Sequence, residues 1–186
     1  MGKLQYESAG TVEYLYVEKE KKFYFMEMNT RIQVEHTISE MITGVDIVEQ
    51  QLEVAFNGQL SVKQSDVKMN GVAIETRINA EDPNNNFAPS PGKIELLHFS
   101  QGHNVRIDTH IYDGYTISPH YDAMIAKIIT HGNDRAGAIA KMRRVLGETV
   151  IGPIPTTLDF QAFIMDHPKY QANDINIHFL RNNDLI

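Results

Sequence analysis

The order of apolar and polar residues near the start of the chain predicts a β-hairpin. Two apolar runs, residues 10–17 and 23–28, flank the polar segment Glu18-Lys19-Glu20-Lys21-Lys22, and a short polar break between two strand-like runs is a hairpin signal. The second run is apolar enough to predict a buried strand. A loop centred on Glu20 gives the facing pairs Val17 with Phe23, Leu15 with Phe25, and Glu13 with Glu27.

The pair of Glu13 and Glu27 is the candidate chemistry of this hairpin. Side chains alternate between the two faces of a strand, so Glu27 shares a face with Phe23, Phe25 and Asn29. A carboxylate in apolar surroundings is costly unless a partner or a metal ion takes up its charge, and directly opposed carboxylates repel each other. With Asn29 they form an oxygen-rich set that suits Mg²⁺ or Mn²⁺.

The alternative to a metal site is a solvated pair of glutamates near the edge of a sheet. The register of the hairpin decides whether a metal site can form, because a shift of one residue would place Glu13 and Glu27 on opposite faces. We therefore expect both carboxylates on one face of adjacent antiparallel strands.

A capping box predicts a short helix directly after the hairpin. Thr37 and Glu40 have the required spacing, at which the hydroxyl and the carboxylate each bond the backbone N–H of the other residue. Gly44 ends this helix, because glycine adopts the left-handed conformation that is common at helix C-termini.

A second helix is predicted over residues 47–57. Asp46 and Glu49 repeat the capping pattern in front of it, and Gly58 follows it. Three of its apolar residues form one stripe at helical spacing, namely Val48, Leu52 and Ala55.

Asn70-Gly71 is a tight-turn signal and marks the boundary between two parts of the chain. The strand predicted after it, residues 72–79, alternates in character from one residue to the next. Val72, Ile74, Thr76 and Ile78 face one way, whereas Glu75, Arg77 and Asn79 face the other.

The remaining elements complete a mixed α/β (α+β) fold in two domains, residues 1–70 and 71–186. Three prolines and three asparagines over residues 82–92 predict a loop. We expect strands near residues 93–99, 104–111 and 123–130, and helices over residues 134–148 and 157–166.

Composition limits the classes of function. The net charge of −7 and the scattered Lys and Arg residues argue against a nucleic-acid-binding protein. No apolar run reaches the roughly 18 residues of a membrane span, and the given sequence does not open with a secretory leader. The chain has no cysteine, which excludes disulfides and thiolate metal sites. These features are compatible with a protein of the cytoplasm.

The segment Glu27-Met28-Asn29-Thr30-Arg31-Ile32-Gln33-Val34-Glu35-His36 carries two carboxylates, an amide and a guanidinium at the end of the hairpin. It resembles the signature of biotin carboxylases, ATP-grasp enzymes that carboxylate biotin. Glu27-x-Asn29 alone is shared by many ATP-grasp ligases, whereas the part from Arg31 to His36 is far more specific. The similarity continues through residues 40–46, 77–83, 89–94, 121–127 and 176–180.

The resemblance implies the identity of both domains. Residues 1–70 would be the C-terminal part of an ATP-grasp domain, and residues 71–186 a biotin carboxylase C-terminal domain. In that family the glycine-rich loop and the lysines that bind ATP precede the hairpin, and this sequence contains neither G-x-x-x-x-G-K-[ST] nor G-x-G-x-x-G. We therefore expect a C-terminal fragment of a larger enzyme, folded but inactive by itself.

The resemblance also implies a reaction. ATP phosphorylates bicarbonate to carboxyphosphate, which delivers CO₂ to biotin on a carrier protein, the first half-reaction of acetyl-CoA carboxylase. Phosphoryl transfer depends on metal ions that neutralise the phosphate oxygens. Glu13, Glu27 and Asn29 would hold Mg²⁺ or Mn²⁺, and Glu13 and Glu27 would bind ATP through the metal.

Five further residues would act on bicarbonate and biotin. The guanidinium of Arg31 matches two oxygens of bicarbonate, with the side chain of Gln33 and the backbone of Val34 beside it. Glu35 would remove the bicarbonate proton as a general base. Arg77 would stabilise carboxyphosphate or the enolate of biotin.

Other interpretations stay open. By spacing alone, Arg31 and Glu35 suit an ion pair at a loop, and Arg77 suits a pair with Glu75 or Glu81. The chain could also belong to pyruvate carboxylase or another acyl-CoA carboxylase, to a different ATP-grasp ligase, or to a non-catalytic module for assembly or docking.

The expected partners follow from the same resemblance. They are a biotin carboxyl carrier protein, carboxyltransferase subunits and a second copy of the chain in a homodimer. The segment from Gln101 to Arg106 departs from the glycine-rich turn that lies at the family's dimer contact. The sequence therefore leaves the oligomeric state open, together with the final acceptor of the carboxyl group.

Overall fold

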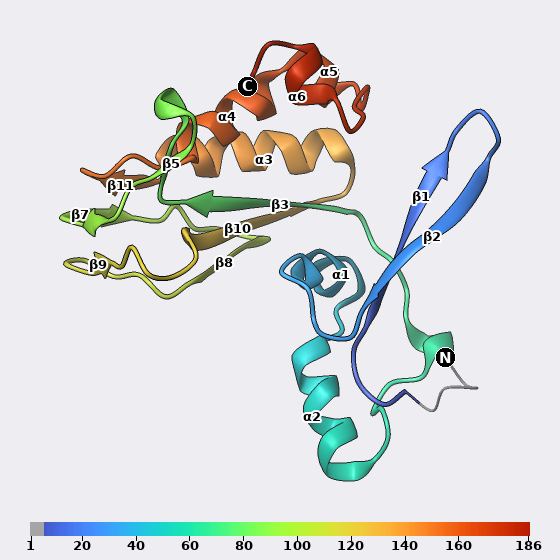
Figure 1. Ribbon diagram of the computed structural model, residues 1–186. Coiled ribbons are helices and arrows are strands. Elements are labelled where there is room, and N and C mark those ends of the chain that lie inside the picture. The colour runs from blue at the N-terminus through green and yellow to red at the C-terminus, as the bar shows by residue number, and fades with distance from the viewer. Residues whose placement is uncertain (1–5) are drawn as a thin grey trace. The chain divides into compact units, whose positions relative to one another are not determined.

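The computed structural model describes residues 6–186 and divides the chain into two compact units, of which the first ends at Asn70 and the second begins at Gly71 (Figure 1). Helices and strands occur in both units, which confirms the predicted mixed α/β fold class. Within the described residues, no helix combines the length and the apolar character needed to cross a membrane.

The first unit contains a β-hairpin formed by β1 (Thr11–Val17) and β2 (Lys22–Asn29). Glu13 lies opposite Glu27, as predicted. The register shifts by one residue directly beyond this pair and leaves Met26 as the extra residue of a β-bulge. Such a bulge sets two residues of one strand against one residue of the other.

The predicted pairs closer to the loop are wrong because of this bulge. The loop is tighter than one centred on Glu20, and the backbone N–H of Glu20 donates to the carbonyl of Val17 at 3.1 Å. The structure pairs Val17 with Lys22 rather than with Phe23, and Leu15 with Tyr24 rather than with Phe25.

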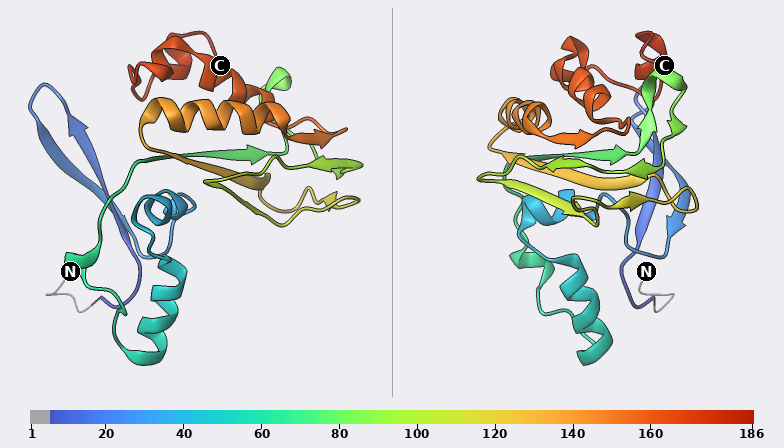
Figure 2. Two further views of the ribbon diagram at one scale, coloured as in Figure 1. Left: turned by 180° about the vertical axis from the view of Figure 1, so that it is seen from behind. Right: turned by 90° about the vertical axis from the view of Figure 1, so that its left-hand side faces the viewer.

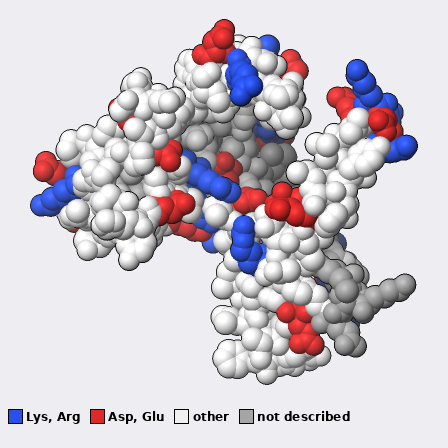
Figure 3. All heavy atoms as spheres, viewed as in Figure 1, with Lys and Arg blue, Asp and Glu red and all other residues white. Residues whose placement is uncertain are grey.

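The hairpin carries exposed apolar side chains, so the predicted burial of β2 is wrong for the described residues. Phe23 is 69% exposed and Phe25 is 64% exposed. These two rings and those of Tyr14 and Tyr16 form an aromatic row, with ring centroids 4.8 to 6.3 Å apart. The two strands form a sheet of their own, which no other described strand joins. Lysines and glutamates alternate at its exposed tip (Figure 3).

Helix α1 (His36–Thr43) begins before Thr37, and the capping box predicted there is wrong. Glu35 occupies the N-cap position without a capping hydrogen bond from its side chain, and Thr37 is completely buried in the first turn. Glu40 bonds a different helix, because its Oε1 accepts the backbone N–H of Ile47 at 2.8 Å.

Helix α2 (Ile47–Asn57) follows the prediction at both ends. The side chain of Asp46 accepts the backbone N–H of Glu49 at 2.8 Å, and Gly58 ends the helix with a left-handed φ of 70°. Gly44 ends α1 in the same way with a φ of 72°. These signals act between near neighbours in sequence, which is why the pattern predicts them well.

The apolar stripe of α2 does not form its buried side within the described residues. Val48 and Leu52 are 46% and 55% exposed, and Ala55 is exposed as well. Gln50 is buried instead, and its side-chain oxygen accepts hydrogen bonds from the backbone N–H and the hydroxyl of Ser61, both at 3.0 Å.

The second unit is built on an antiparallel sheet with the strand order β3-β10-β8 (Figure 1). These strands are β3 (Val72–Asn79), β10 (Met124–Gly132) and β8 (Val105–Thr109). The predicted alternation of β3 is confirmed, because Ile74, Thr76 and Ile78 are buried whereas Arg77 is exposed.

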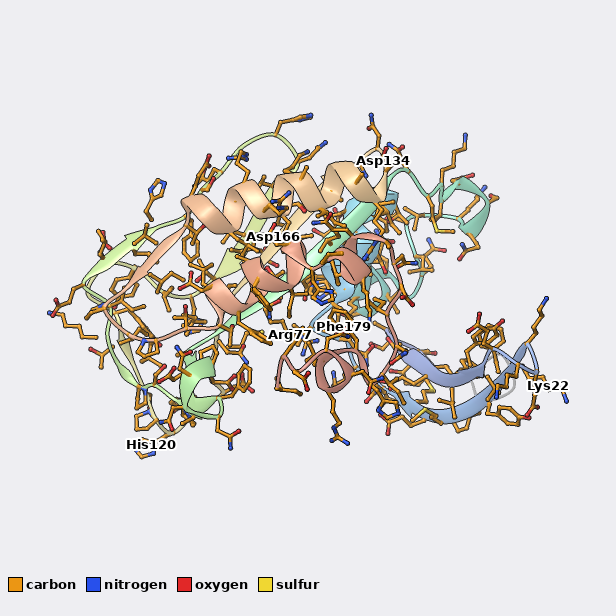
Figure 4. The ribbon with its side chains drawn as sticks, turned by 90° about the horizontal axis from the view of Figure 1, so that it is seen from above. Lys22, Arg77, His120, Asp134, Asp166 and Phe179 are labelled. Atoms are coloured by element: carbon orange, nitrogen blue, oxygen red, sulfur yellow. The ribbon has the colours of Figure 1, made fainter. Side chains whose placement is uncertain are left out.

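Helices α3 (Arg135–Glu148) and α4 (Leu158–Asp166) cover the same side of this sheet (Figure 2). Asp134, labelled in Figure 4, caps α3 by accepting the backbone N–H of Gly137 at 2.7 Å. The core between sheet and helices contains Ile74, Ile78 and Ile128 from the strands, Ala138, Met142 and Val145 from α3, and Leu158 and Met165 from α4.

Short elements complete the two units. They are the 3₁₀ helices η1 (Gln64–Asp66) and η2 (Pro83–Asn85), the strands β4 (Glu81–Asp82), β5 (Ala88–Pro89), β6 (Gly92–Lys93), β7 (Leu96–His98), β9 (Thr116–Ile117) and β11 (Val150–Gly152), and the helices α5 (Pro168–Gln171) and α6 (Phe179–Asn182). The strand expected near residues 93–99 is divided in two, because the backbone N–H of Ile94 donates to Tyr115 and that of Glu95 to Gly152.

A cluster of charges joins β8 and β10. Asp108 lies opposite Lys127 and accepts hydrogen bonds from Nε and Nη2 of Arg106 at 2.7 and 3.0 Å, with Nζ of Lys127 at 3.4 Å. Partial burial raises the pKa of Asp108, but the bonds and charges of Arg106 and Lys127 outweigh it and hold the pKa below its ordinary value.

We expect the substitution Ile128→Ala to lower the free energy of unfolding by about 2–5 kcal/mol, because Ile128 is completely buried in the central strand and its truncation leaves a cavity. Urea unfolding followed by circular dichroism measures the loss. Ile177→Ala is the matched control, because it removes the same atoms from a residue that is 87% exposed. Equal losses in the two variants would contradict the assigned core.

Asp108→Asn should lower the free energy of unfolding near neutral pH by at most about 1 kcal/mol, since the pair is partly exposed. A carboxyl group whose pKa is lowered by folding contributes stability above its unfolded pKa and loses it as the pH falls through its folded pKa. The difference in the free energy of unfolding between wild type and variant should therefore be constant at neutral pH. It should shrink as the pH falls below 3.8, the ordinary pKa of an aspartate, which applies in the unfolded chain. A constant difference across that range in urea titrations would refute this assignment.

Candidate active site

The carboxylates of Glu13 and Glu27 lie on one face of the hairpin and share a hydrogen-bond donor. Nδ2 of Asn29 donates to Oε1 of Glu13 at 2.7 Å and to Oε1 of Glu27 at 3.1 Å. One amide can bridge two carboxylates only when they lie on the same side of the strands. The predicted geometry of this pair is therefore confirmed.

A second amide reaches the same pair from the segment that follows β2. Nε2 of Gln33 donates to Oε1 of Glu13 at 2.9 Å. Two amide groups thus offset the repulsion between the carboxylates, as hydrogen bonds to charged groups do more strongly than neutral ones. Sequence reasoning missed this contact and had no signal for it, because Gln33 and Glu13 are 20 residues apart.

This cluster suits a divalent cation in the chemistry of its donors. Mg²⁺ is commonly held by one or two carboxylates together with phosphate oxygens of the substrate, and Glu13 and Glu27 provide two carboxylates. Asn29 turns its amide nitrogen toward them, so its oxygen could serve as a ligand only after the amide rotates. Among the described residues, no three His, Cys, Asp or Glu side chains gather as a metal site.

A cavity of about 200 Å³ shares Gln33 with this cluster, whereas Glu13, Glu27 and Asn29 do not line it. Arg31, Gln33 and Glu35 line it, together with residues of α1 and the start of β1. Nη1 of Arg31 donates to the carbonyl of Ile32 at 3.1 Å, and both Arg31 and Glu35 are exposed. Val34 is half-buried and is not among the lining residues. The cavity thus brings a guanidinium and a carboxylate to one small space.

Arg77 belongs to the second unit and lies on the exposed face of β3 (Figure 4). Its Nε is 4.0 Å from Oε1 of Glu75, whose side chain is only 6% exposed. The pair with Glu75 that the spacing allowed is therefore present. Glu81 instead accepts a hydrogen bond from Nδ2 of Asn79 at 3.2 Å.

Two family descriptions match this chain. Residues 75–182 match the family described as Biotin carboxylase C-terminal domain, and residues 1–63 match Carbamoyl-phosphate synthase L chain, ATP binding domain. The chain belongs to the biotin carboxylase family. The fold class predicted from the sequence, the C-terminal part of an ATP-grasp domain followed by a biotin carboxylase C-terminal domain, is confirmed.

Relatives in this family are similar over nearly all of the chain. Biotin carboxylase 1 of Bacillus subtilis is 49% identical over 97% of the chain, which covers 40% of that relative. A pyruvate carboxylase subunit of Methanothermobacter thermautotrophicus is 48% identical over 94% of the chain, which covers 35% of it. The chain thus spans between about a third and two fifths of the length of such relatives.

Solved structures of the family superimpose closely. The biotin carboxylase domain dimer of the 2-oxoglutarate carboxylase of Hydrogenobacter thermophilus, in complex with MgADP, ADP and bicarbonate, gives a TM-score of 0.92 at 41% identity, covering 95% of this chain and 39% of that one. The biotin carboxylase of Campylobacter jejuni in an ATP complex gives a TM-score of 0.89 at 45% identity, covering 94% and 39%.

We expect Mg-ATP to stabilise the purified 186-residue chain very little. Two carboxylates without further described ligands bind Mg²⁺ weakly, whereas a ligand at about 100 times its Kd would add about 2.7 kcal/mol of stability. Differential scanning calorimetry with and without Mg-ATP measures the effect. A cooperative melt whose Tm hardly moves is the expected result, and Glu27→Gln should behave like the wild type. A large upward shift that Glu27→Gln abolishes would show that the chain alone forms a tight nucleotide site.

Proposed function

We propose that this chain takes part in the ATP-dependent carboxylation of biotin on a carrier protein, with bicarbonate as the carboxyl source and carboxyphosphate as the intermediate. The observation that carries the proposal is that Gln33 bonds the bridged Glu13–Glu27 pair and also lines a small cavity together with Arg31 and Glu35. A relative solved with MgADP and bicarbonate bound supports the assignment of both substrates.

Glu13, Glu27 and Asn29 would hold Mg²⁺ or Mn²⁺ in this function. The metal, when bound, neutralises the phosphate oxygens of ATP, which is the largest demand of phosphoryl transfer. The two carboxylates already share a face, so they need no movement of the strands to act together. Without the metal, the amide of Asn29 donates hydrogen bonds to both carboxylates.

The cavity that shares Gln33 with the cluster would bind bicarbonate. The two terminal nitrogens of Arg31 can bond two oxygens of a planar anion. Gln33 links this anion to the metal pair, because its side chain already bonds Glu13, and the backbone of Val34 would add a further contact. Glu35 lines the same cavity and would remove the bicarbonate proton, which makes the anion a better nucleophile toward the phosphoryl group.

Arg77 would act on the second substrate. Its guanidinium is exposed on β3 and is balanced by the nearly buried carboxylate of Glu75 at 4.0 Å. A positive charge held in this way can stabilise the developing negative charge of the biotin enolate or of carboxyphosphate.

The physiological setting would be a biotin-dependent carboxylase of the cytoplasm. A biotin carboxyl carrier protein and carboxyltransferase subunits would be its partners, a homodimer its assembly, and acetyl-CoA carboxylase in fatty acid synthesis its enzyme. A role in pyruvate carboxylase is a second candidate, because a relative of that name is 48% identical. The chemistry proposed for Arg31 and Glu35 is common to both.

Replacing Glu35 with Gln in the complete enzyme should lower bicarbonate-dependent turnover by roughly 10²–10⁴-fold, the usual scale of general base catalysis. The substitution preserves shape and removes only the base, so the KM for ATP should change little. Initial rates of ADP release at saturating bicarbonate and biotin measure the effect.

Glu18→Gln is the matched control for Glu35→Gln, because it makes the same chemical change at an exposed position in the hairpin loop. It should leave turnover unchanged. Near-normal carboxylation by Glu35→Gln would exclude Glu35 as the base. An enzyme without any bicarbonate-dependent turnover would point to the non-catalytic alternative.

A further inference from the structure

His36 contacts the segment that carries Arg31, Gln33 and Glu35, and Glu40 contacts His36. The segment connects β2 to α1, and two of its proposed site residues, Arg31 and Glu35, are exposed. Exposed side chains on a connector depend on their backbone for position, and small displacements of reacting groups are costly in rate. The contacts that fix this backbone therefore bear directly on the site.

His36 fixes the carbonyl group of Gln33. Nδ1 of the ring lies 2.7 Å from this oxygen, and the backbone N–H of His36 donates to the same oxygen at 3.2 Å. A carbonyl oxygen can only accept, so Nδ1 carries a proton and donates it to this bond. The orientation of the peptide after Gln33 is thus set by two donors from one residue.

The carboxylate of Glu40 lies close to the other nitrogen of the imidazole ring. Oε2 of Glu40 lies 3.8 Å from Nε2 of His36, and the side chains of Glu40 and His36 are 7% and 16% exposed. The other oxygen, Oε1, accepts the backbone N–H of Ile47 at 2.8 Å. Ile47 is the first residue of α2, where a carboxylate is favoured by the helix dipole.

These contacts form one continuous chain across the first unit. It runs from Glu13 to the side chain of Gln33, from the carbonyl of Gln33 to His36, from His36 to Glu40, and from Glu40 to Ile47. One end is a carboxylate of the proposed metal pair, and the other is the start of α2. Gln33, His36 and Ile47 of this chain also line the proposed bicarbonate cavity.

We propose that His36 and Glu40 are positioning residues that hold the backbone of Gln33 to Glu35 in the geometry that bicarbonate binding requires. This inference rests on the function proposed for Arg31 and Glu35. Glu40 acts through His36, and His36 acts through the carbonyl of Gln33.

The test compares three substitutions of His36 in the complete enzyme. His36→Ala removes the bond to Gln33 and should raise the KM for bicarbonate roughly tenfold, the lower end of the usual effect of supporting residues. His36→Asn keeps an amide donor at the position of Nδ1 and should restore most of this loss. His36→Gln places its amide nearer to the position of Nε2, toward Glu40, and should restore less. The KM for ATP should stay within about twofold throughout, because no ATP contact is changed.

Glu40→Gln and His120→Ala complete the set. Glu40→Gln keeps an acceptor for the N–H of Ile47 but removes the charge beside the imidazole, so it should raise the KM for bicarbonate while the Tm stays near that of the wild type. His120→Ala removes an exposed histidine of the second unit and should change neither value. It controls for the loss of a histidine as such.

Backbone mobility gives a readout that does not depend on catalysis. In the 186-residue chain, ¹⁵N relaxation should show higher mobility at Gln33, Val34 and Glu35 in His36→Ala, and recovery in His36→Asn.

Unchanged mobility would overturn the positioning role, and so would equal KM values for bicarbonate in wild type and His36→Ala. A KM for ATP that rises in proportion would also overturn it, since that would indicate a general loss of structure. If the wild-type enzyme has no bicarbonate-dependent activity, the proposed function is wrong. The part of this inference that concerns the KM for bicarbonate is then wrong as well.

Discussion

The hairpin loop imposes a register that, by itself, would separate the two carboxylates of the candidate site. Next to the loop, Val17 pairs with Lys22, and the same register continued along the strands would set Glu13 opposite Met26. Glu27 would then point to the other face of the sheet. The bulge at Met26 adds one residue to β2 and brings Glu27 opposite Glu13, so the amide bridge from Asn29 and every proposed metal contact depend on it.

The fold was predictable where its signals act between near neighbours. The cap of α2 by Asp46 and the alternation of β3 are properties of short stretches, and both agree with the structure. The capping box at Thr37 failed because Glu40 bonds Ile47, seven residues away, rather than its own helix. The bulge at Met26 could not be predicted for a related reason. A bulge depends on how two strands pair and not on the residues of one strand alone.

In the site, too, the features set by nearby residues were predictable and the contacts between distant residues were not. The sequence placed Glu13 and Glu27 together because an error of one residue at the loop and the bulge cancelled at that pair. The family resemblance implied a bicarbonate role for Gln33, but the bond from its amide to Glu13 joins residues 20 positions apart and has no signal in the sequence. Residue type and spacing thus brought the two carboxylates together, whereas the contacts that orient the side chains had no signal in the sequence.

The aromatic row has a consequence for how the chain behaves in concentrated solution. β1 and β2 form a sheet of only two strands, so each leaves backbone N–H and C=O groups along its outer edge without a partner strand among the described residues. Open edges next to exposed Tyr and Phe rings are a template for pairing with a second hairpin. The alternating lysines and glutamates of the loop put charge at one end of that template, where it disfavours stacking of the tips. Self-association of this chain would therefore begin along the strands rather than at the loop.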